Sequence, residues 1–136
     1  MVRADQVIVA LDILDVDRVL DLVDKLLPSG ICWFKVGVSL WTHAGREVVD
    51  AIKQRGGKVF LDLKLHDIPH QVGLATTAAA ELGVDLLTVH ASGGGEMLKA
   101  AVAGAGDDMR LLAITVLTSL DAEEGEVERL AQLAYD

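Results

Sequence analysis

The sequence predicts an α/β protein built on a parallel β-sheet. Short runs rich in apolar and β-branched residues alternate five times with longer amphipathic segments along the 136 residues. Repeated β/α units joined by short loops form right-handed crossovers, and these give a parallel sheet. Polar residues stand at or near the end of each predicted strand, where a (β/α)₈ barrel keeps its active site, so a barrel is favoured over an open doubly wound sheet. These residues are Asp12, Lys35, Asp62 with Lys64, His90 and Thr118.

Five strands are expected from the apolar and β-branched runs. They are placed at residues 6–12, 31–38, 60–65, 85–91 and 109–118. The first is expected to be buried. In the third, leucines at alternate positions share one face, while Asp62 and Lys64 lie on the other. Charged side chains on a covered face of a sheet indicate either an ion pair at the rim of the sheet or a functional site.

The intervening segments have helical spacing of their apolar residues. They predict helices at residues 15–27, 39–55, 71–82, about 94–103, and 127–135. Asp15 is placed to cap the first helix. The third is rich in alanine, whose small side chain allows close packing on a sheet. The run Gly93-Gly94-Gly95 matches no phosphate-loop pattern and is interpreted as a tight strand-to-helix turn.

The bulk composition excludes several classes of function. One domain spanning residues 1–136 is expected from the length. A formal net charge of −9 argues against nucleic acid or an anionic membrane as partner. The single Cys32 cannot form an intramolecular disulfide and offers no zinc pattern. The short apolar run near the N-terminus is neither a signal-peptide core nor a membrane span, so we expect a soluble cytoplasmic protein.

Lys35 is the least easily explained of the polar residues, because it lies between apolar neighbours in a predicted buried strand. A buried ammonium group needs a nearby carboxylate, and Asp62 on the next predicted strand is the obvious candidate. Lys35, Asp62, Lys64 and Asp67 can then form a chain of alternating charge. In such a chain a protonated lysine can act as general acid toward a carbanion. Asp12, taken singly, is also explained as a strand-terminating turn residue, and His90 as a core histidine.

Five segments together resemble the bacterial form of orotidine 5'-phosphate decarboxylase. They are Ala10-Leu11-Asp12, Phe34-Lys35-Val36-Gly37, Asp62-Leu63-Lys64-Leu65-His66-Asp67-Ile68-Pro69, Val89-His90-Ala91-Ser92-Gly93-Gly94 and Leu117-Thr118-Ser119. The resemblance implies a (β/α)₈ TIM barrel that converts orotidine 5'-phosphate to uridine 5'-phosphate and CO₂ in pyrimidine (UMP) biosynthesis. It implies no metal and no cofactor.

The resemblance also implies a role for each matching residue. Asp12 and Lys35 are similar to the pair that contacts the ribose, with Lys35 also in the charge chain. Asp62 resembles the carboxylate beside the departing carboxyl group, and Lys64 resembles the donor of a proton to the C6 carbanion. Asp67 and Ile68 resemble residues that contribute to the active site of the neighbouring subunit, which implies a homodimer. Thr118 resembles the residue that contacts the pyrimidine.

Two features depart from the family pattern. Gln71 stands where the family usually has a threonine that helps to hold the ribose across the dimer. The sequence also supplies about five β/α units, whereas a closed barrel needs eight strands and typically about 250 residues. We therefore expect an N-terminal fragment that lacks the last three strands and the phosphate-binding loops, with little or no activity alone.

Two alternative hypotheses of function compete with the decarboxylase. One is a metal-dependent sugar-phosphate enzyme of the hexulose-phosphate synthase or ketogulonate-phosphate decarboxylase type, which shares the Asp-x-Lys pattern; the continuation His66-Asp67-Ile68-Pro69 favours the nucleotide enzyme. The other is a catalytically silent half-barrel that serves as an assembly module. In an isolated five-strand unit, the first and fifth strands are expected to be open sheet edges.

Overall fold

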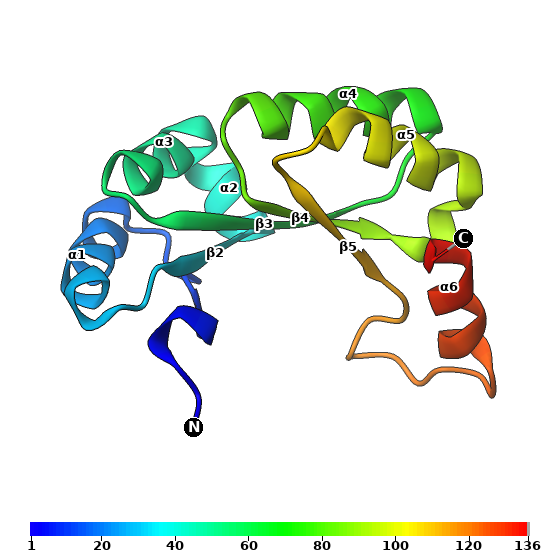
Figure 1. Cartoon of the computed structure of the whole chain (residues 1–136), viewed down its shortest axis with the longest axis horizontal. Coiled ribbons are helices and arrows are strands. Elements are labelled where there is room, and N and C mark those ends of the chain that lie inside the picture. The colour runs from blue at the N-terminus through cyan, green and yellow to red at the C-terminus, as the bar shows by residue number, and fades with distance from the viewer. Residues whose placement is uncertain (136) are drawn as a thin grey trace. The chain divides into compact units, whose positions relative to one another are not determined.

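The structure is a computed structural model that describes residues 1–135. Strands alternate with helices along the chain, which confirms the predicted α/β class (Figure 1). The strands form a sheet in the order β1-β2-β3-β4-β5, so β1 and β5 are its edge strands, as predicted. Their bounds are β1 Ile8–Ala10, β2 Trp33–Gly37, β3 Lys58–Leu65, β4 Leu86–His90 and β5 Arg110–Ile114. The chain divides into two compact units, described separately below: residues 1–62 with 82–86, and residues 63–81 with those from 87 onward.

In the first unit, β1 pairs in parallel with β2, and β2 pairs in parallel with β3. Helix α1 (Val16–Leu26) follows β1, and the carboxylate of Asp15 accepts a hydrogen bond from the Arg18 N–H at 3.1 Å, which confirms the predicted cap. A 3₁₀ turn (Leu27–Ser29) ends the helix at Gly30. The core of this unit is formed by fully buried side chains of α1, β2, β3 and the helices between them: Val19, Val23, Phe34, Val36, Leu40, Val48, Val49, Ile52, Val59 and Leu61.

The single helix predicted at 39–55 is wrong, because the structure has two helices there. Helix α2 (Val38–Ala44) ends and α3 (Arg46–Gln54) begins at Gly45. Gly45 has φ +54° and ψ −134°, a backbone conformation that glycine adopts and other residues avoid. Its N–H donates to the Trp41 carbonyl at 2.7 Å, which closes α2. The periodicity of apolar residues continues through this break, so it carried no signal of the bend.

The first strand is shorter and more exposed than predicted. Residues Ile8 and Ala10 are exposed and Val9 is partly buried. An edge strand has a neighbour on one side only, so its side chains have less to pack against than those of a central strand. Its β-branched composition predicted the strand correctly but not its burial.

In the second unit, helix α4 (Pro69–Glu81) begins two residues earlier than predicted, with Pro69 at the first helical position. Helix α5 (Gly95–Ala105) packs closely on α4, whereas the sequence had led us to expect the small side chains of α4 to pack on a sheet. A Cβ added to Gly104 would lie 2.7 Å from the Gly73 carbonyl oxygen, so glycine is required at this contact. The core here contains Val72, Val89, Met97 and Ala101.

The end of the second unit differs from the sequence prediction at the fifth strand. Strand β5 ends at Ile114, four residues before Thr118, which lies in the turn that follows. A 3₁₀ turn (Ala91–Gly93) precedes α5, and α6 (Glu126–Tyr135) contacts both. Across the described part of the chain, no helix is long and apolar enough to cross a membrane.

Candidate active site

The ammonium group of Lys35 lies between two carboxylates in the first unit. Lys35 Nζ is 3.6 Å from Asp12 Oδ1 and 3.8 Å from Asp62 Oδ2. The side chain of Asp62 is 12% exposed, that of Lys35 24% and that of Asp12 62%, so the carboxylate farther from water is Asp62. Both N···O distances fit ion pairs but are too long for hydrogen bonds. A partly buried ammonium group is stabilised by two such carboxylates. The partner that the sequence assigned to Lys35 is therefore present, and Asp12 is a second one.

Strand register explains how these three side chains meet. Ala10 on β1 pairs with Lys35 on β2, and Gly37 on β2 pairs with Asp62 on β3. Asp12, two residues after Ala10, therefore comes level with Gly37 at the end of β2. The Leu11 N–H donates to the Lys35 carbonyl at 3.0 Å, which fixes the chain just before Asp12. A Cβ at Gly37 would lie 3.5 Å from Asp12 Oδ1 and 3.7 Å from Lys35 Nζ. Glycine thus leaves the space beside the ammonium group open.

Lys64 lies in the second unit and has an unusual backbone. Its φ is +50°, and it is the single non-glycine residue with positive φ within residues 1–135. Its N–H donates to Thr88 Oγ1 at 2.9 Å, and Thr88 on β4 is fully buried. Positive φ is rare for a residue with a Cβ and is found at functional sites that hold it in place. The period-two pattern of β3 predicted an extended strand through Lys64 and missed this.

A pocket of about 340 Å³ adjoins Lys64 within the second unit. Its other lining residues run from Leu112 to Ser119, at the end of β5 and in the turn after it. Thr118 is among them, so the structure brings two sequence-predicted site residues to one cavity. The lining combines Lys64 and hydroxyl-bearing residues of this turn with aliphatic ones. Cavities that hold small ligands commonly have such a mixed lining.

Two histidines lie next to each other close to Lys64. The rings of His66 and His90 have centroids 5.3 Å apart and are tilted by 41°. Partial burial lowers the pKa of His90, and the charges of His66 and Lys64 lower it further. His90 is therefore neutral near pH 7. The sequence singled out His90 as a core histidine, and its contact with His66 had no sequence signal.

Asp67 and Ile68 are exposed at the start of α4. Asp67 Oδ1 accepts the Ile68 N–H at 2.6 Å, and the Ile68 carbonyl accepts the N–H groups of Gln71 and Val72. This arrangement satisfies the first backbone donors of the helix. Ile68 remains 62% exposed, which is high for a large apolar side chain. Gln71 is exposed on the first turn of α4.

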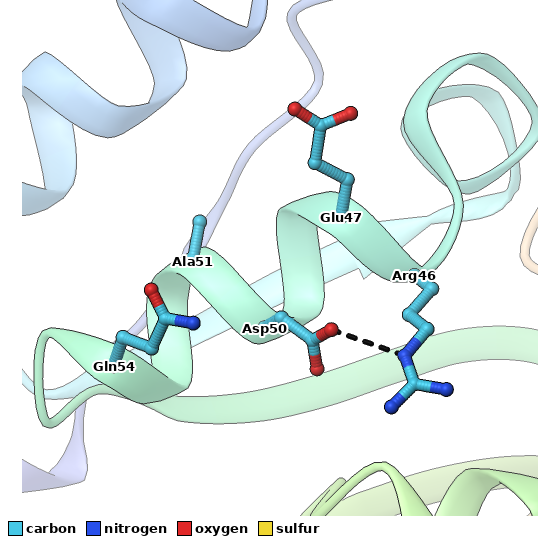
Figure 2. Close-up of a pocket in the computed structure, with 5 residues that line it drawn as sticks. All are labelled: Arg46, Glu47, Asp50, Ala51 and Gln54. Carbon is cyan, nitrogen blue, oxygen red and sulfur yellow. Dashed lines mark hydrogen bonds and ion pairs between the residues drawn. The ribbon is translucent and has the colours of Figure 1, made fainter.

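A second hollow lies on the surface of α3, away from these groups in the sequence (Figure 2). Its volume is about 580 Å³, larger than that of the pocket beside Lys64. Its polar groups include Arg46 and Asp50, whose Nε and Oδ2 atoms form an exposed i,i+4 ion pair at 3.1 Å. Such a pair is common on helices and carries no chemistry. Among the described residues, no group of three or more His, Cys, Asp or Glu side chains is arranged to hold a metal ion.

The fold and these side chains define the class of protein: β/α units with lysines and carboxylates at or near the ends of strands. Residues 5–135 match the model of the orotidine 5'-phosphate decarboxylase / HUMPS family. The chain belongs to this family, as the sequence resemblance indicated.

Curated relatives support the same assignment. The chain is 48% identical over 128 residues to an orotidine 5'-phosphate decarboxylase of Moorella thermoacetica, a match that covers 88% of this chain and 50% of the relative. It is 42% identical over 134 residues to the Fusobacterium nucleatum protein of the same name, covering 96% of this chain and 56% of the relative. The chain thus spans about half the length of the curated relatives it matches.

Solved structures confirm the fold. A crystal structure of orotidine 5'-phosphate decarboxylase from Lactobacillus acidophilus matches with a TM-score of 0.84 and 37% identity, covering 94% of this chain and 66% of that one. The Thermotoga maritima enzyme of the same name matches with a TM-score of 0.75 and 27% identity, covering 93% of this chain and 62% of that one. The fold is that of part of a TIM barrel, as predicted.

Proposed function

We propose that the gene product containing this chain is a carboxy-lyase, an orotidine 5'-phosphate decarboxylase that forms uridine 5'-phosphate and CO₂ in pyrimidine biosynthesis. The observation that carries the proposal is Lys35 between Asp12 and Asp62, at 3.6 and 3.8 Å, in a chain nearly half identical to curated enzymes of that name. The chain supplies five β/α units of one barrel domain. A cytoplasmic location fits a reaction on soluble nucleotides.

In the proposed reaction, the bond between C6 of the pyrimidine and its carboxyl carbon breaks, and the electron pair stays on C6 as CO₂ leaves. Lys64 then donates a proton from its ammonium group to C6, and it regains one from solvent. Asp62 places negative charge near the departing carboxylate, a repulsion that is relieved when CO₂ forms. No metal or cofactor takes part in these steps.

Substrate contacts are proposed for the remaining residues. Asp12 and Lys35 bind the ribose hydroxyls, for which a carboxylate and an ammonium group are suitable partners. Thr118 contacts the pyrimidine, and its presence on the wall of the same pocket as Lys64 supports this role. The charge chain of Lys35, Asp62, Lys64 and Asp67 keeps each member beside an opposite charge.

A homodimer is proposed, with Asp67 and Ile68 lent to the site of the neighbouring subunit. The exposure of both residues supports this, since an apolar side chain that is 62% exposed gains from burial at an interface. Gln71 lies one turn further along α4 and is exposed as well. Because the family usually has a threonine at this position, the ribose contact across the dimer is not among the contacts proposed for this chain.

The activity is tested by measuring turnover of orotidine 5'-phosphate in the gene product and in its Lys64→Ala variant. The loss of substrate absorbance reports the rate. Loss of a general acid should lower kcat by about 10²–10⁴-fold. Lys99→Ala is the matched control, because Lys99 is an exposed lysine of the same unit paired with Glu96 on α5. Near-normal turnover in Lys64→Ala would remove the proton-donor role. Adding a metal chelator should leave wild-type turnover unchanged; loss of turnover would favour the metal-dependent sugar-phosphate enzymes.

Shared sites are tested with hybrid dimers. Asp12→Asn and Asp67→Asn homodimers should both be inactive. A mixed dimer should regain up to about half of the activity of a wild-type dimer. The physical reason is that one of its two sites contains neither substitution. Heterodimers purified with two different tags provide the measurement. No recovery in verified heterodimers would contradict the lending of Asp67 across the interface.

A further inference from the structure

Thr88 is a buried polar residue to which neither the sequence nor the family resemblance gives a role. It lies in β4 between the buried residues Leu87 and Val89, and its exposure is 0%. Only Thr76 shares this degree of burial among the polar residues described in 1–135. Valine has nearly the same shape and avoids the desolvation of a hydroxyl group, so a threonine at such a position needs a hydrogen-bonding purpose.

Thr88 accepts a hydrogen bond from the backbone of Lys64. Thr88 Oγ1 accepts the Lys64 N–H at 2.9 Å, and Lys64 has φ +50°. The bond is made by the same residue whose backbone is in the left-handed region. In regular parallel pairing, a strand N–H donates to a carbonyl oxygen of its neighbour. Here a side-chain hydroxyl takes that place, at the point where the backbone leaves the extended conformation.

The left-handed backbone determines where the side chain of Lys64 goes. Successive side chains of an extended strand alternate between its two faces, whereas a residue with positive φ breaks the alternation and changes the direction of its Cβ. In this structure Lys64 lines the pocket formed with residues Leu112–Ser119. A return of Lys64 to extended geometry would redirect its side chain relative to that pocket.

We propose that Thr88 is a positioning residue: its hydroxyl holds the left-handed backbone of Lys64 and thereby sets the position of the Lys64 ammonium group in the pocket. The kinetic part of this inference rests on the proposed function, in which Lys64 is the proton donor. The structural part, that the Thr88 hydroxyl keeps φ of Lys64 positive, stands independently of the reaction. A glycine would adopt this backbone freely but has no ammonium group, so the lysine must be held there by a neighbour.

The experiment compares Thr88→Val with Thr76→Val in the gene product. Thr76 is a matched control, because it is equally buried in the same unit and its hydroxyl donates to the Val72 carbonyl within α4 at 2.7 Å. Thr88→Ser restores the hydroxyl and serves as the rescue variant. Crystal structures report φ of Lys64, and initial rates report kcat and KM separately. Thermal unfolding reports whether each variant loses a similar amount of stability.

In Thr88→Val we expect φ of Lys64 to become negative and kcat to fall roughly 10- to 100-fold, because a misplaced catalytic group loses reactivity without losing substrate binding. KM should stay within about twofold of wild type. Thr88→Ser and Thr76→Val should keep positive φ and near-wild-type kcat. If Thr88→Val does not fold, Thr88→Cys answers the same question, since a thiol is a weak acceptor of similar size.

The proposal is overturned if Thr88→Val keeps positive φ at Lys64, or if its kcat is no lower than that of Thr76→Val. A wild-type gene product without decarboxylase activity contradicts the proposed function instead. In that event φ of Lys64 in Thr88→Val still decides the structural part: a change to negative φ supports it, and unchanged φ overturns it.

Discussion

Lys35 and Lys64 are two lysines at strand positions that are held in place by different means. Lys35 has ordinary strand geometry and lies between two carboxylates at 3.6 and 3.8 Å. Lys64 has a left-handed backbone, and a buried threonine hydroxyl accepts its N–H at 2.9 Å. Two carboxylates thus lie beside the ammonium group of the first, while the side chain of the second starts from a backbone conformation that is unfavourable for an L-residue. An ion pair leaves a long side chain some freedom, whereas a fixed backbone limits where the side chain can start.

The largest expected difference between the two lysines is in stability. Lys35→Met removes the ammonium group that lies 3.8 Å from the carboxylate of Asp62, whose side chain is 12% exposed. The free energy of unfolding should fall by about 1–3 kcal/mol, the usual cost of removing one partner of a buried polar group. Urea unfolding followed by circular dichroism provides the measurement. The double variant Lys35→Met with Asp62→Leu should recover part of the loss, because it removes both charges. An unchanged stability in Lys35→Met would show that the pair contributes nothing.

The difference in stability between a glycine variant and an alanine variant should have opposite signs at positions 64 and 35. At position 64, the glycine variant should be about 1 kcal/mol more stable than the alanine variant, because glycine lacks the Cβ that makes φ of +50° unfavourable. At position 35, in regular strand geometry, glycine should be about 0.5–1 kcal/mol less stable than alanine. Urea unfolding of the four variants checks both signs. The same sign at both positions would contradict the left-handed backbone of Lys64.

The smallest expected effect concerns His90. Burial, His66 and Lys64 all lower the pKa of His90 below its ordinary value of 6.5. Lys64→Met should raise this pKa toward 6.5, since one of the three causes is removed, whereas Lys99→Met should leave it unchanged. Titration of the imidazole signals by NMR provides the measurement. An identical His90 pKa in wild type and Lys64→Met would show that the Lys64 charge does not act on this ring.

The same lowered pKa gives the pH dependence of stability. Because the pKa of His90 is lower in the folded state, the unfolded state binds more protons, so this contribution to stability is complete above about pH 6.5 and is lost as pH falls through the folded-state pKa. His90→Asn should therefore reduce the loss of stability between pH 7 and pH 5. The double variant with His66→Asn separates the part of the lowered His90 pKa that His66 causes.

Much of the fold could be predicted because it depends on local patterns. The alternation of strands and helices follows from periodicity, and the Asp15 cap follows from capping chemistry. The break at Gly45 and the short β5 were missed. Both occur where apolar periodicity continues past the point at which the backbone bends, so the pattern alone gives no boundary.

The sequence by itself determined one pairing: a lysine in an apolar strand requires a carboxylate, and Asp62 was the partner it predicted for Lys35. Only the tertiary structure decided how the second lysine is held. The positive φ of Lys64, the hydroxyl of Thr88 that accepts its N–H, and the contact of His66 with His90 depend on residues more than twenty positions apart in the sequence being brought together. No local pattern encodes such a pairing, because it arises from strand register and packing rather than from the preferences of neighbouring residues.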